Sequence, residues 1–176
     1  AVALGLATTV CLWWMYFDRF AGIAEERLRG HDDVVLAAAD SYSYLHLVIV
    51  AGIIVFAVGM KVAIHDVTGD LPEAARLALC GGLALYFAGN ALFRLRLVGA
   101  VANAQLAGVL GMLAVFALGA GHSTVTVTAL ATAVVVAVCA LDSIDGRAHE
   151  QGAAPPAEVD RPTGAGHNGA RADEHA

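Results

Sequence analysis

The sequence predicts an all-α protein: a multi-pass bundle of five transmembrane helices followed by a disordered tail. Of the 176 residues, 59% are hydrophobic and 15% are charged, against roughly a quarter charged in an ordinary soluble domain. Residues 97–141 form a run of 45 residues without Asp, Glu, Lys or Arg. Because one helical span needs about 20 mainly apolar residues, this run alone has room for two spans. An integral membrane protein is therefore expected, with the lipid bilayer as its first partner.

Five apolar segments divide residues 1–141 into helices. The predicted spans are residues 1–17, 44–64, 74–93, 97–119 and 123–141, with residues 21–40 as an interfacial segment after the first span. Between the second and third spans stands DVTGDLP, residues 66–72, whose proline cannot continue a helix. Arg94 and Arg96 separate the third span from the fourth because charges are costly in hydrocarbon. A Gly-rich turn at residues 119–122 precedes the last span.

The two ends of the sequence differ in composition. Residues 142–176 contain no Leu, Phe, Tyr or Trp and hold seven of the sixteen acids, so they predict a disordered, acidic cytosolic tail. The chain opens on Ala1 inside an apolar run of 17 residues, about 25 Å of helix and slightly short for a span. We therefore expect the chain to be the C-terminal part of a longer protein, whose missing N-terminal part would be a partner. A homo-oligomer stays open.

Charge asymmetry predicts the orientation in the membrane. The side after the first, third and fifth spans holds eight Lys and Arg residues, whereas the other side holds only Lys61 and Arg76. Positive loops stay in the cytoplasm. The sequence thus predicts a multi-pass protein of the bacterial inner membrane with a cytoplasmic C-terminus.

Several classes of function are disfavoured. An acidic tail and the lack of a basic patch exclude nucleic acid as a partner. The cysteines Cys11, Cys80 and Cys139 show no metal-binding spacing, so no metal or other cofactor is predicted. Motifs of hydrolases and nucleotide-binding enzymes, such as GxSxG, HExxH and GxGxxG, are absent from the sequence. We expect no enzymatic activity and no catalytic residue.

Polar residues gather at the predicted cytoplasmic ends of the first three spans. Tyr86 and Asn90 are one helical turn apart on the third span, and Tyr42 and His46 have the same spacing at the start of the second. Polar groups in lipid usually face protein or water. We therefore predict a polar cluster of Tyr42, His46, Tyr86 and Asn90, with Asp18 within reach from the first span.

Structural interpretations compete with this cluster. His46 and Asn90 form either a structural hydrogen bond or a ligand or proton site, and the sequence does not decide between them. On the opposite side, Lys61 and His65 lie near Arg76 and several acids, a pattern that predicts ion pairs around a loop. An interfacial aromatic belt is the alternative interpretation of Tyr42 and of its aromatic neighbours, namely Trp13, Trp14, Tyr16 and Tyr44.

Four blocks carry a resemblance to a known family. They are LWWMYFD at residues 12–18, DSYSYLHL at 40–47, VAGIIVFAVGMK at 50–61 and LCGGLALYFAGNALFRLR at 79–96. In this order they resemble the C-terminal half of the bacterial low temperature requirement A (LtrA) proteins. The resemblance implies a multi-pass inner-membrane protein linked by name to growth in the cold, and it supplies no substrate. Val48 replaces an expected proline and Asn90 a frequent histidine, which weakens a histidine pair between the two spans.

Two main classes of function remain. The leading hypothesis is a transporter-like or solute-handling membrane protein, whose activity the family resemblance leaves uncharacterised. The alternative is a non-transporting membrane scaffold or sensor that binds a cytosolic partner. An embedded oxidoreductase with His46 as a ligand is disfavoured because the predicted cytoplasmic side has no second intramembrane histidine.

Overall fold

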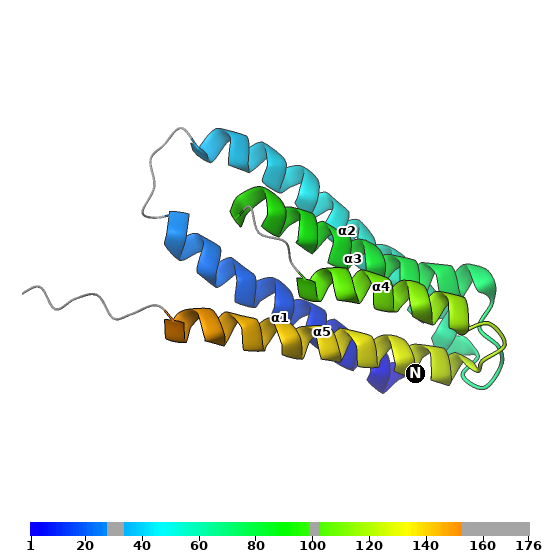
Figure 1. Cartoon of the computed structure of the whole chain (residues 1–176). Helices are drawn as coiled ribbons and strands as arrows, with labels where there is room; N and C mark the ends of the chain where they lie inside the picture. The colour runs from blue at the N-terminus through cyan, green and yellow to red at the C-terminus, as the bar shows by residue number, and fades with distance from the viewer. Residues whose placement is uncertain (28–33, 99–102, 153–176) are drawn as a thin grey trace, which may run out of the picture.

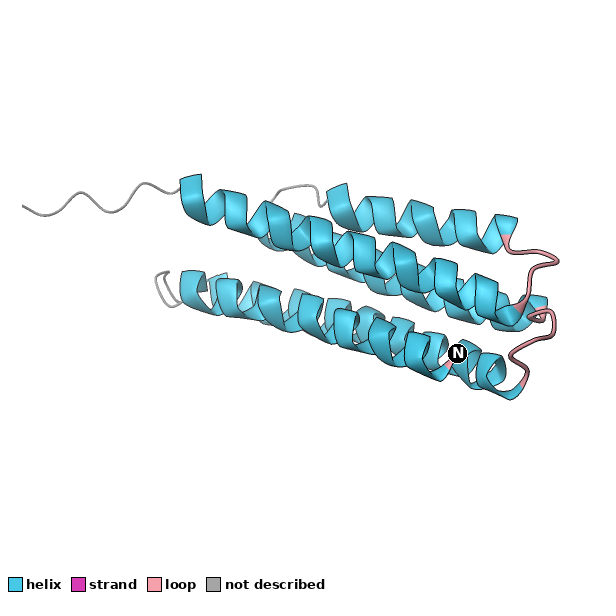
Figure 2. Cartoon of the chain, turned by 90° about the horizontal axis from the view of Figure 1, so that it is seen from below, coloured by secondary structure: helices cyan, strands magenta, loops and turns pink. Residues whose placement is uncertain are grey.

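The computed structural model describes residues 1–27, 34–98 and 103–152, with side chains described for residues 1–17, 44–96 and 103–144. Within these ranges the helices are α1 (Val2–Arg27), α2 (Val34–His65), α3 (Glu73–Val98), α4 (Asn103–Leu118) and α5 (Thr124–Gly152). All five run lengthwise along one bundle (Figures 1 and 2). The described residues form no strand, and the predicted all-α class is confirmed.

The bundle has two different ends (Figure 1). At the loop end, the connections 66–72 and 119–123 join α2 to α3 and α4 to α5, and α1 begins nearby. At the tail end lie the last turns of α1, α3 and α5 and the first turns of α2 and α4. Helices α1, α3 and α5 therefore run from the loop end to the tail end, and α2 and α4 run the other way.

Helix α3 is the centre of the packing. It contacts α2 on one side and α4 on the other, while α5 contacts α4 and α1. The interface between α2 and α3 is the largest, and glycines bring the two backbones together there. A Cβ placed on Gly52 would lie 2.8 Å from the carbonyl oxygen of Gly82, and one on Gly59 would lie 2.5 Å from the amide nitrogen of Leu79. Small residues at helix contacts are typical of membrane bundles.

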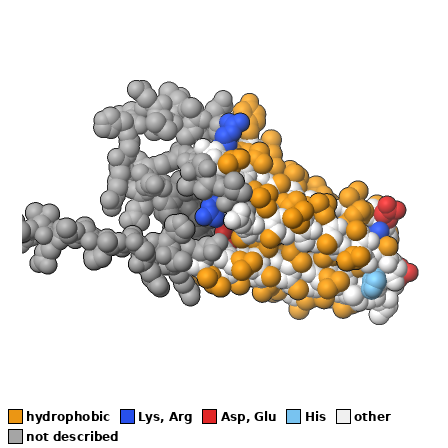
Figure 3. Space-filling model, viewed as in Figure 1, with side chains coloured by type: hydrophobic (Ala, Val, Ile, Leu, Met, Phe, Trp, Pro, Cys, Tyr) orange, Lys and Arg blue, Asp and Glu red, His pale blue; other side chains and the backbone are white. Residues whose placement is uncertain are grey.

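Large apolar side chains lie on the surface as well as in the core. Fully buried side chains include Met15, Leu79, Leu83, Tyr86, Phe87 and Met112. Helix α1 nevertheless exposes a stripe of apolar residues, namely Val2, Leu6, Val10, Trp13, Trp14 and Phe17. Figure 3 shows apolar side chains over the flank of the bundle and acidic and basic side chains near its ends. Apolar surface of this extent is stable in contact with lipid rather than water.

Three helical segments are long and apolar enough to cross a membrane: Tyr44–His65, Glu73–Arg96 and Thr124–Ile144. Their length and composition fit an integral membrane protein. The apolar helical segments Val2–Phe17 and Asn103–Leu118 are shorter, about 24 Å each at 1.5 Å per residue. Their membrane crossing, and hence the five-span arrangement, stays a prediction.

Helix boundaries differ from the predicted ones in three places. Residues 21–27 continue α1 and residues 34–40 begin α2, and residues 28–33 lie outside the described part. The interfacial position of residues 21–40 stays a prediction. Helix α3 continues through Arg94 and Arg96 to Val98. Helix α5 continues to Gly152, so the predicted tail does not begin at residue 142; residues 153–176 lie outside the described part. Charged residues limit how deep a helix lies in lipid, but Arg, Leu, Glu and Gln are good helix formers.

Candidate functional site

His46 on α2 contacts Tyr16 on α1, a partner that the sequence did not predict. Its Nδ1 lies 3.1 Å from the hydroxyl oxygen of Tyr16, and the two ring centroids are 5.8 Å apart. Both side chains are half-buried. The contact fixes the histidine ring from a second helix while leaving part of the ring accessible.

Tyr86 and Asn90 are both buried on α3. The Tyr86 hydroxyl donates to the carbonyl oxygen of Leu12 on α1 at 2.7 Å. The Asn90 Nδ2 donates to the carbonyl oxygen of Tyr86 at 2.9 Å, within the same helix. Asn90 is only 3% exposed. Its side-chain amide is therefore held inside the bundle by the backbone of its own helix.

Helix α1 links the two parts of the predicted cluster. Leu12 and Tyr16 are one turn apart, and they meet Tyr86 and His46 respectively. The side chains of Asp18 and Tyr42 lie outside the described residues, so the full five-residue cluster stays a prediction.

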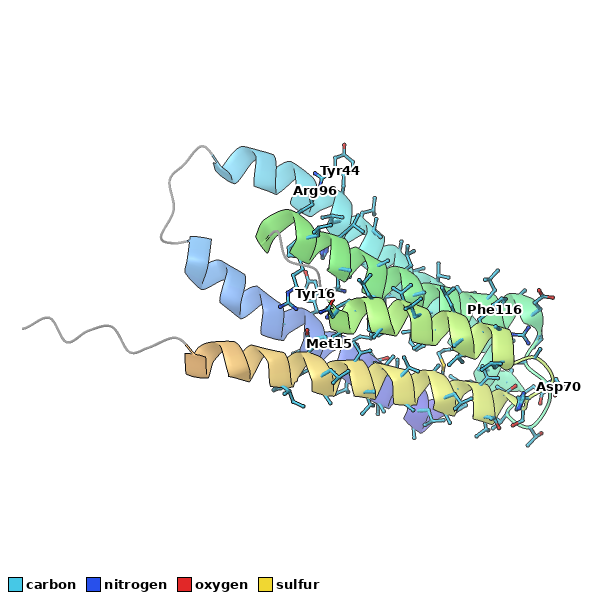
Figure 4. The ribbon with its side chains drawn as sticks, viewed as in Figure 1. Met15, Tyr16, Tyr44, Asp70, Arg96 and Phe116 are labelled. Atoms are coloured by element: carbon cyan, nitrogen blue, oxygen red, sulfur yellow. The ribbon has the colours of Figure 1, made fainter. Side chains whose placement is uncertain are left out.

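Sequence reasoning missed the role of Tyr16, which it assigned to an interfacial belt. Tyr44, from the same predicted belt, is 68% exposed and points away from the bundle (Figure 4). The sequence feature that distinguishes Tyr16 from the exposed aromatic residues is its spacing along the helix. Tyr16 is four residues after buried Leu12, which places it on the inward face of α1, whereas Trp13 and Phe17 share the exposed stripe.

A second polar group, which the sequence did not indicate, joins α3, α4 and α5 at the tail end. Gln105 is fully buried, and its Nε2 donates to Oδ1 of Asp142 at 3.1 Å. The same Oδ1 lies 3.6 Å from Nη1 of Arg94. The Gln105 Oε1 is buried without a hydrogen-bond partner in the described part of the chain, which costs about 1–3 kcal/mol. The sequence feature that could have indicated this group is the single Gln within a long run of mainly apolar residues.

Polar residues at the loop end have local structural roles. His65 Nδ1 lies 2.8 Å from the carbonyl oxygen of Lys61, and Asp66 accepts a hydrogen bond from the amide of Gly69. The Arg76 guanidinium lies 5.1 Å from the centroid of the Phe116 ring. The predicted ion pairs among these loop-end residues do not form in the described chain. Local hydrogen bonds hold His65 and Asp66. Arg76 packs on the Phe116 ring instead, and its buried Nε has no hydrogen-bond partner among the described residues.

The hydroxyl groups of the buried threonines also form hydrogen bonds within the bundle. Thr128 and Thr132 on α5 each donate to the carbonyl oxygen four residues earlier, as the sequence allows for Ser and Thr in helices. Thr8 on α1 lies 3.0 Å from Thr132, hydroxyl to hydroxyl. In the described residues no three His, Cys, Asp or Glu side chains come together as a metal site.

Comparison with known proteins gives one match. The family model described as "Bacterial low temperature requirement A protein (LtrA)" matches residues 1–140. No curated protein and no solved structure matches the chain. The match extends from α1 through nearly all of the apolar part of α5. It includes the residues around His46 and those around Gln105, with the exception of Asp142.

Proposed function

Because the chain belongs to the bacterial low temperature requirement A family, we propose that it is a transporter-like, solute-handling protein of the bacterial inner membrane with its tail end in the cytoplasm. The observation that carries the proposal is the contact between His46 and Tyr16. It holds a half-buried titratable ring between α1 and α2. Ionisable residues within membrane spans are rare and commonly mark a solute or proton pathway.

The orientation is supported by charge. Six of the ten Lys and Arg residues lie in residues 19–29, 94–96 and 147, which end or follow the apolar segments of α1, α3 and α5, and two more lie in residues 153–176. Positive charge favours the cytoplasmic side. The lipid bilayer is the partner proposed for the exposed apolar stripe of α1.

Cold growth provides the test of the His46 site. In a bacterium that needs this protein at low temperature, His46→Ala in the complete protein should fail to restore growth in the cold although the variant reaches the membrane at a normal level. His65→Ala is the matched control, because His65 is exposed at the loop end and bonds only to a neighbouring carbonyl. Normal cold growth with a normally expressed His46→Ala variant would refute the proposal.

The alternative is a scaffold or sensor that transports nothing. Two observations favour it: the backbones of α2 and α3 touch at Gly52 and Gly82, and α5 continues beyond its apolar segment to Gly152. A close backbone contact leaves no room for a solute between α2 and α3 at these glycines, and the continuation of α5 offers a surface for a cytosolic partner.

Thiol labelling distinguishes the two functions. In a protein whose native cysteines are replaced by Ala, Asn90→Cys and Leu92→Cys are compared in inverted membrane vesicles with a charged thiol reagent. Asn90 is buried and Leu92 is 51% exposed on the bundle surface. A water-filled path for a solute predicts labelling at position 90 and not at position 92. Absence of labelling at both positions would favour the scaffold, because then no water reaches the polar face of α3.

A further inference from the structure

We propose that Arg76 on α3 and Phe116 on α4 form a binding site for the phosphate group of a membrane lipid at the loop end of the bundle. The guanidinium carbon of Arg76 lies 5.1 Å from the centroid of the Phe116 ring. Figure 4 shows Phe116 toward the loop end of α4. The inference goes beyond the solute-handling proposal, because the site lies at the opposite end of the bundle from His46 and Tyr16.

The guanidinium of Arg76 has no hydrogen-bond or ion-pair partner in the described part of the chain. Its Nε is buried, although the side chain as a whole is only half-buried. The acids at the same end, Asp66, Asp70 and Glu73, form no ion pair with it in that part. An arginine side chain stays protonated in proteins, and a charge taken partly out of water without a partner is costly. An anion from outside the chain would remove this cost.

The contact with Phe116 holds the guanidinium while leaving it able to bind. A cation within about 6 Å of a ring centroid is attracted to the ring face, and a guanidinium over a ring keeps its in-plane N–H groups available as donors. A Cβ on Gly119 would lie 3.2 Å from Cδ of Arg76, so this glycine leaves room for the side chain. Because Nε is the buried nitrogen, the two Nη groups are the donors left for a ligand. Paired N–H groups of this kind fit two oxygens of a phosphate.

The position of Arg76 favours a lipid phosphate over a phosphate in solution. Arg76 lies in the first turn of the candidate span Glu73–Arg96, about 4.5 Å from its start at 1.5 Å per residue. Lipid headgroups lie at this level, just outside the hydrocarbon core. Leu77, which follows Arg76, is 56% exposed, and Leu118, two residues after Phe116, is 73% exposed. A lipid gains from this apolar surface through its acyl chains, whereas a free phosphate does not.

Thermal unfolding of the purified full chain in alkyl maltoside micelles tests the proposal, because this detergent contains no phosphate. Phosphatidylglycerol is added to the micelles, and a diacylglycerol with the same acyl chains is the control lipid without a phosphate. A ligand that binds only the folded state raises the apparent Tm. We expect phosphatidylglycerol to raise the Tm more than diacylglycerol does at the same concentration.

Variants connect this additional rise in Tm to the site. Arg76→Gln should abolish it, and Arg76→Lys should increase the half-saturating lipid concentration several-fold, because an ammonium group lacks the planar pair of donors. Arg96→Gln is the matched control, since Arg96 is an exposed arginine at the other end of α3, and it should keep the full rise. If Arg76→Gln fails to fold, Arg76→Lys and Phe116→Leu carry the test, with the same several-fold weakening expected for both.

Three results would overturn the proposal. Equal Tm values with phosphatidylglycerol and diacylglycerol would mean that no lipid phosphate is bound. Equal losses in Arg76→Gln and Arg96→Gln would mean that anionic lipid is attracted by charge alone. A rise that depends on Arg76 in sodium phosphate, relative to sodium chloride at equal ionic strength, but not in phosphatidylglycerol, would assign the site to free phosphate. Cold growth plays no part in these measurements, so the outcome is independent of the His46 proposal.

Discussion

At the loop end, Thr124 donates through both its backbone amide and its hydroxyl to the carbonyl oxygen of Gly69, at 2.9 Å each, and Asp70 pairs with Ser123 as an isolated β-bridge. At the tail end, several contacts between helices are made by side chains, including those of His46 to Tyr16 and Gln105 to Asp142. Backbone contacts tolerate many substitutions, whereas side-chain contacts require particular residues. Residue identity therefore matters more at the tail end.

The environment increases this difference. Loop-end polar residues such as His65 and Asp66 are exposed, so water competes for their hydrogen bonds. Gln105 and Asn90 are buried, and a polar contact in a low dielectric is stronger when made and more costly when missing. We therefore expect substitutions at the loop end to affect stability only, and substitutions of the buried polar residues to affect function as well. Four predictions test this comparison.

Labelling of the two ends from outside the cell should give the largest contrast. The charge asymmetry predicts that Thr68→Cys, at the loop end, reacts with a membrane-impermeant thiol reagent in intact cells, and that Ala148→Cys, near the end of α5, does not. Both variants are made in a background without native cysteines, and both should react after the membrane is permeabilised. Reaction of Ala148→Cys in intact cells would reverse the proposed orientation.

Breaking the contact between α2 and α3 should disrupt both ends together. A Cβ on Gly82 would collide with the backbone nitrogen of Phe56 and would lie 2.7 Å from the carbonyl oxygen of Gly52. Because backbone atoms cannot move aside alone, Gly82→Ala should destabilise the protein by about 3 kcal/mol. Unfolding of the purified protein in mixed detergent micelles measures the effect.

The adjacent glycine provides the matched control. A Cβ on Gly81 would find only Leu77 Cδ1, at 3.8 Å, which is an ordinary contact. Gly81→Ala should be neutral, or more stable by about 0.5–1 kcal/mol through helix propensity. Equal effects of the two substitutions would mean that the close approach of the backbones is not what stabilises this interface.

Much of the fold could be predicted from the sequence because a helix in hydrocarbon needs a run of about 20 mainly apolar residues. The apolar runs identified the helices of the bundle. Helix ends were harder to predict. The charged residues Arg94 and Asp142 follow the predicted spans, yet α3 and α5 continue beyond them, because hydrogen bonding within a helix does not depend on apolar side chains.

The candidate site was predictable only in part. Spacing placed Tyr86 and Asn90 on one face of α3, and both are buried there. It could not identify Tyr16 as the partner of His46, because that contact depends on how α1 lies against α2. The group of Gln105 and Asp142 was also out of reach, since its two residues are 37 positions apart and meet only through the packing of α4 on α5.

Removal of one hydrogen bond between α3 and α1 should have a moderate effect. Tyr86→Phe keeps the buried ring but loses the bond to the Leu12 carbonyl, so we expect a loss of about 1–1.5 kcal/mol in stability. Tyr44→Phe is the control, because Tyr44 is 68% exposed, and its stability should not change measurably. Both variants are compared by unfolding in the same micelles. Indistinguishable stabilities would show that the Tyr86 hydroxyl does not hold α1 to α3.

The smallest effect is expected at the loop end. Thr124→Val removes the hydroxyl bond to Gly69 but leaves the backbone bond between the same residues, so the loss of stability should be about 1 kcal/mol or less. Thr9→Val is the control, because Thr9 is exposed and donates only within its own helix. Cold growth should be normal for both variants, in contrast to His46→Ala. If Thr124→Val abolished cold growth while the protein remained folded in the membrane, the loop end would share in the function, and the division of labour between the two ends would have to be abandoned.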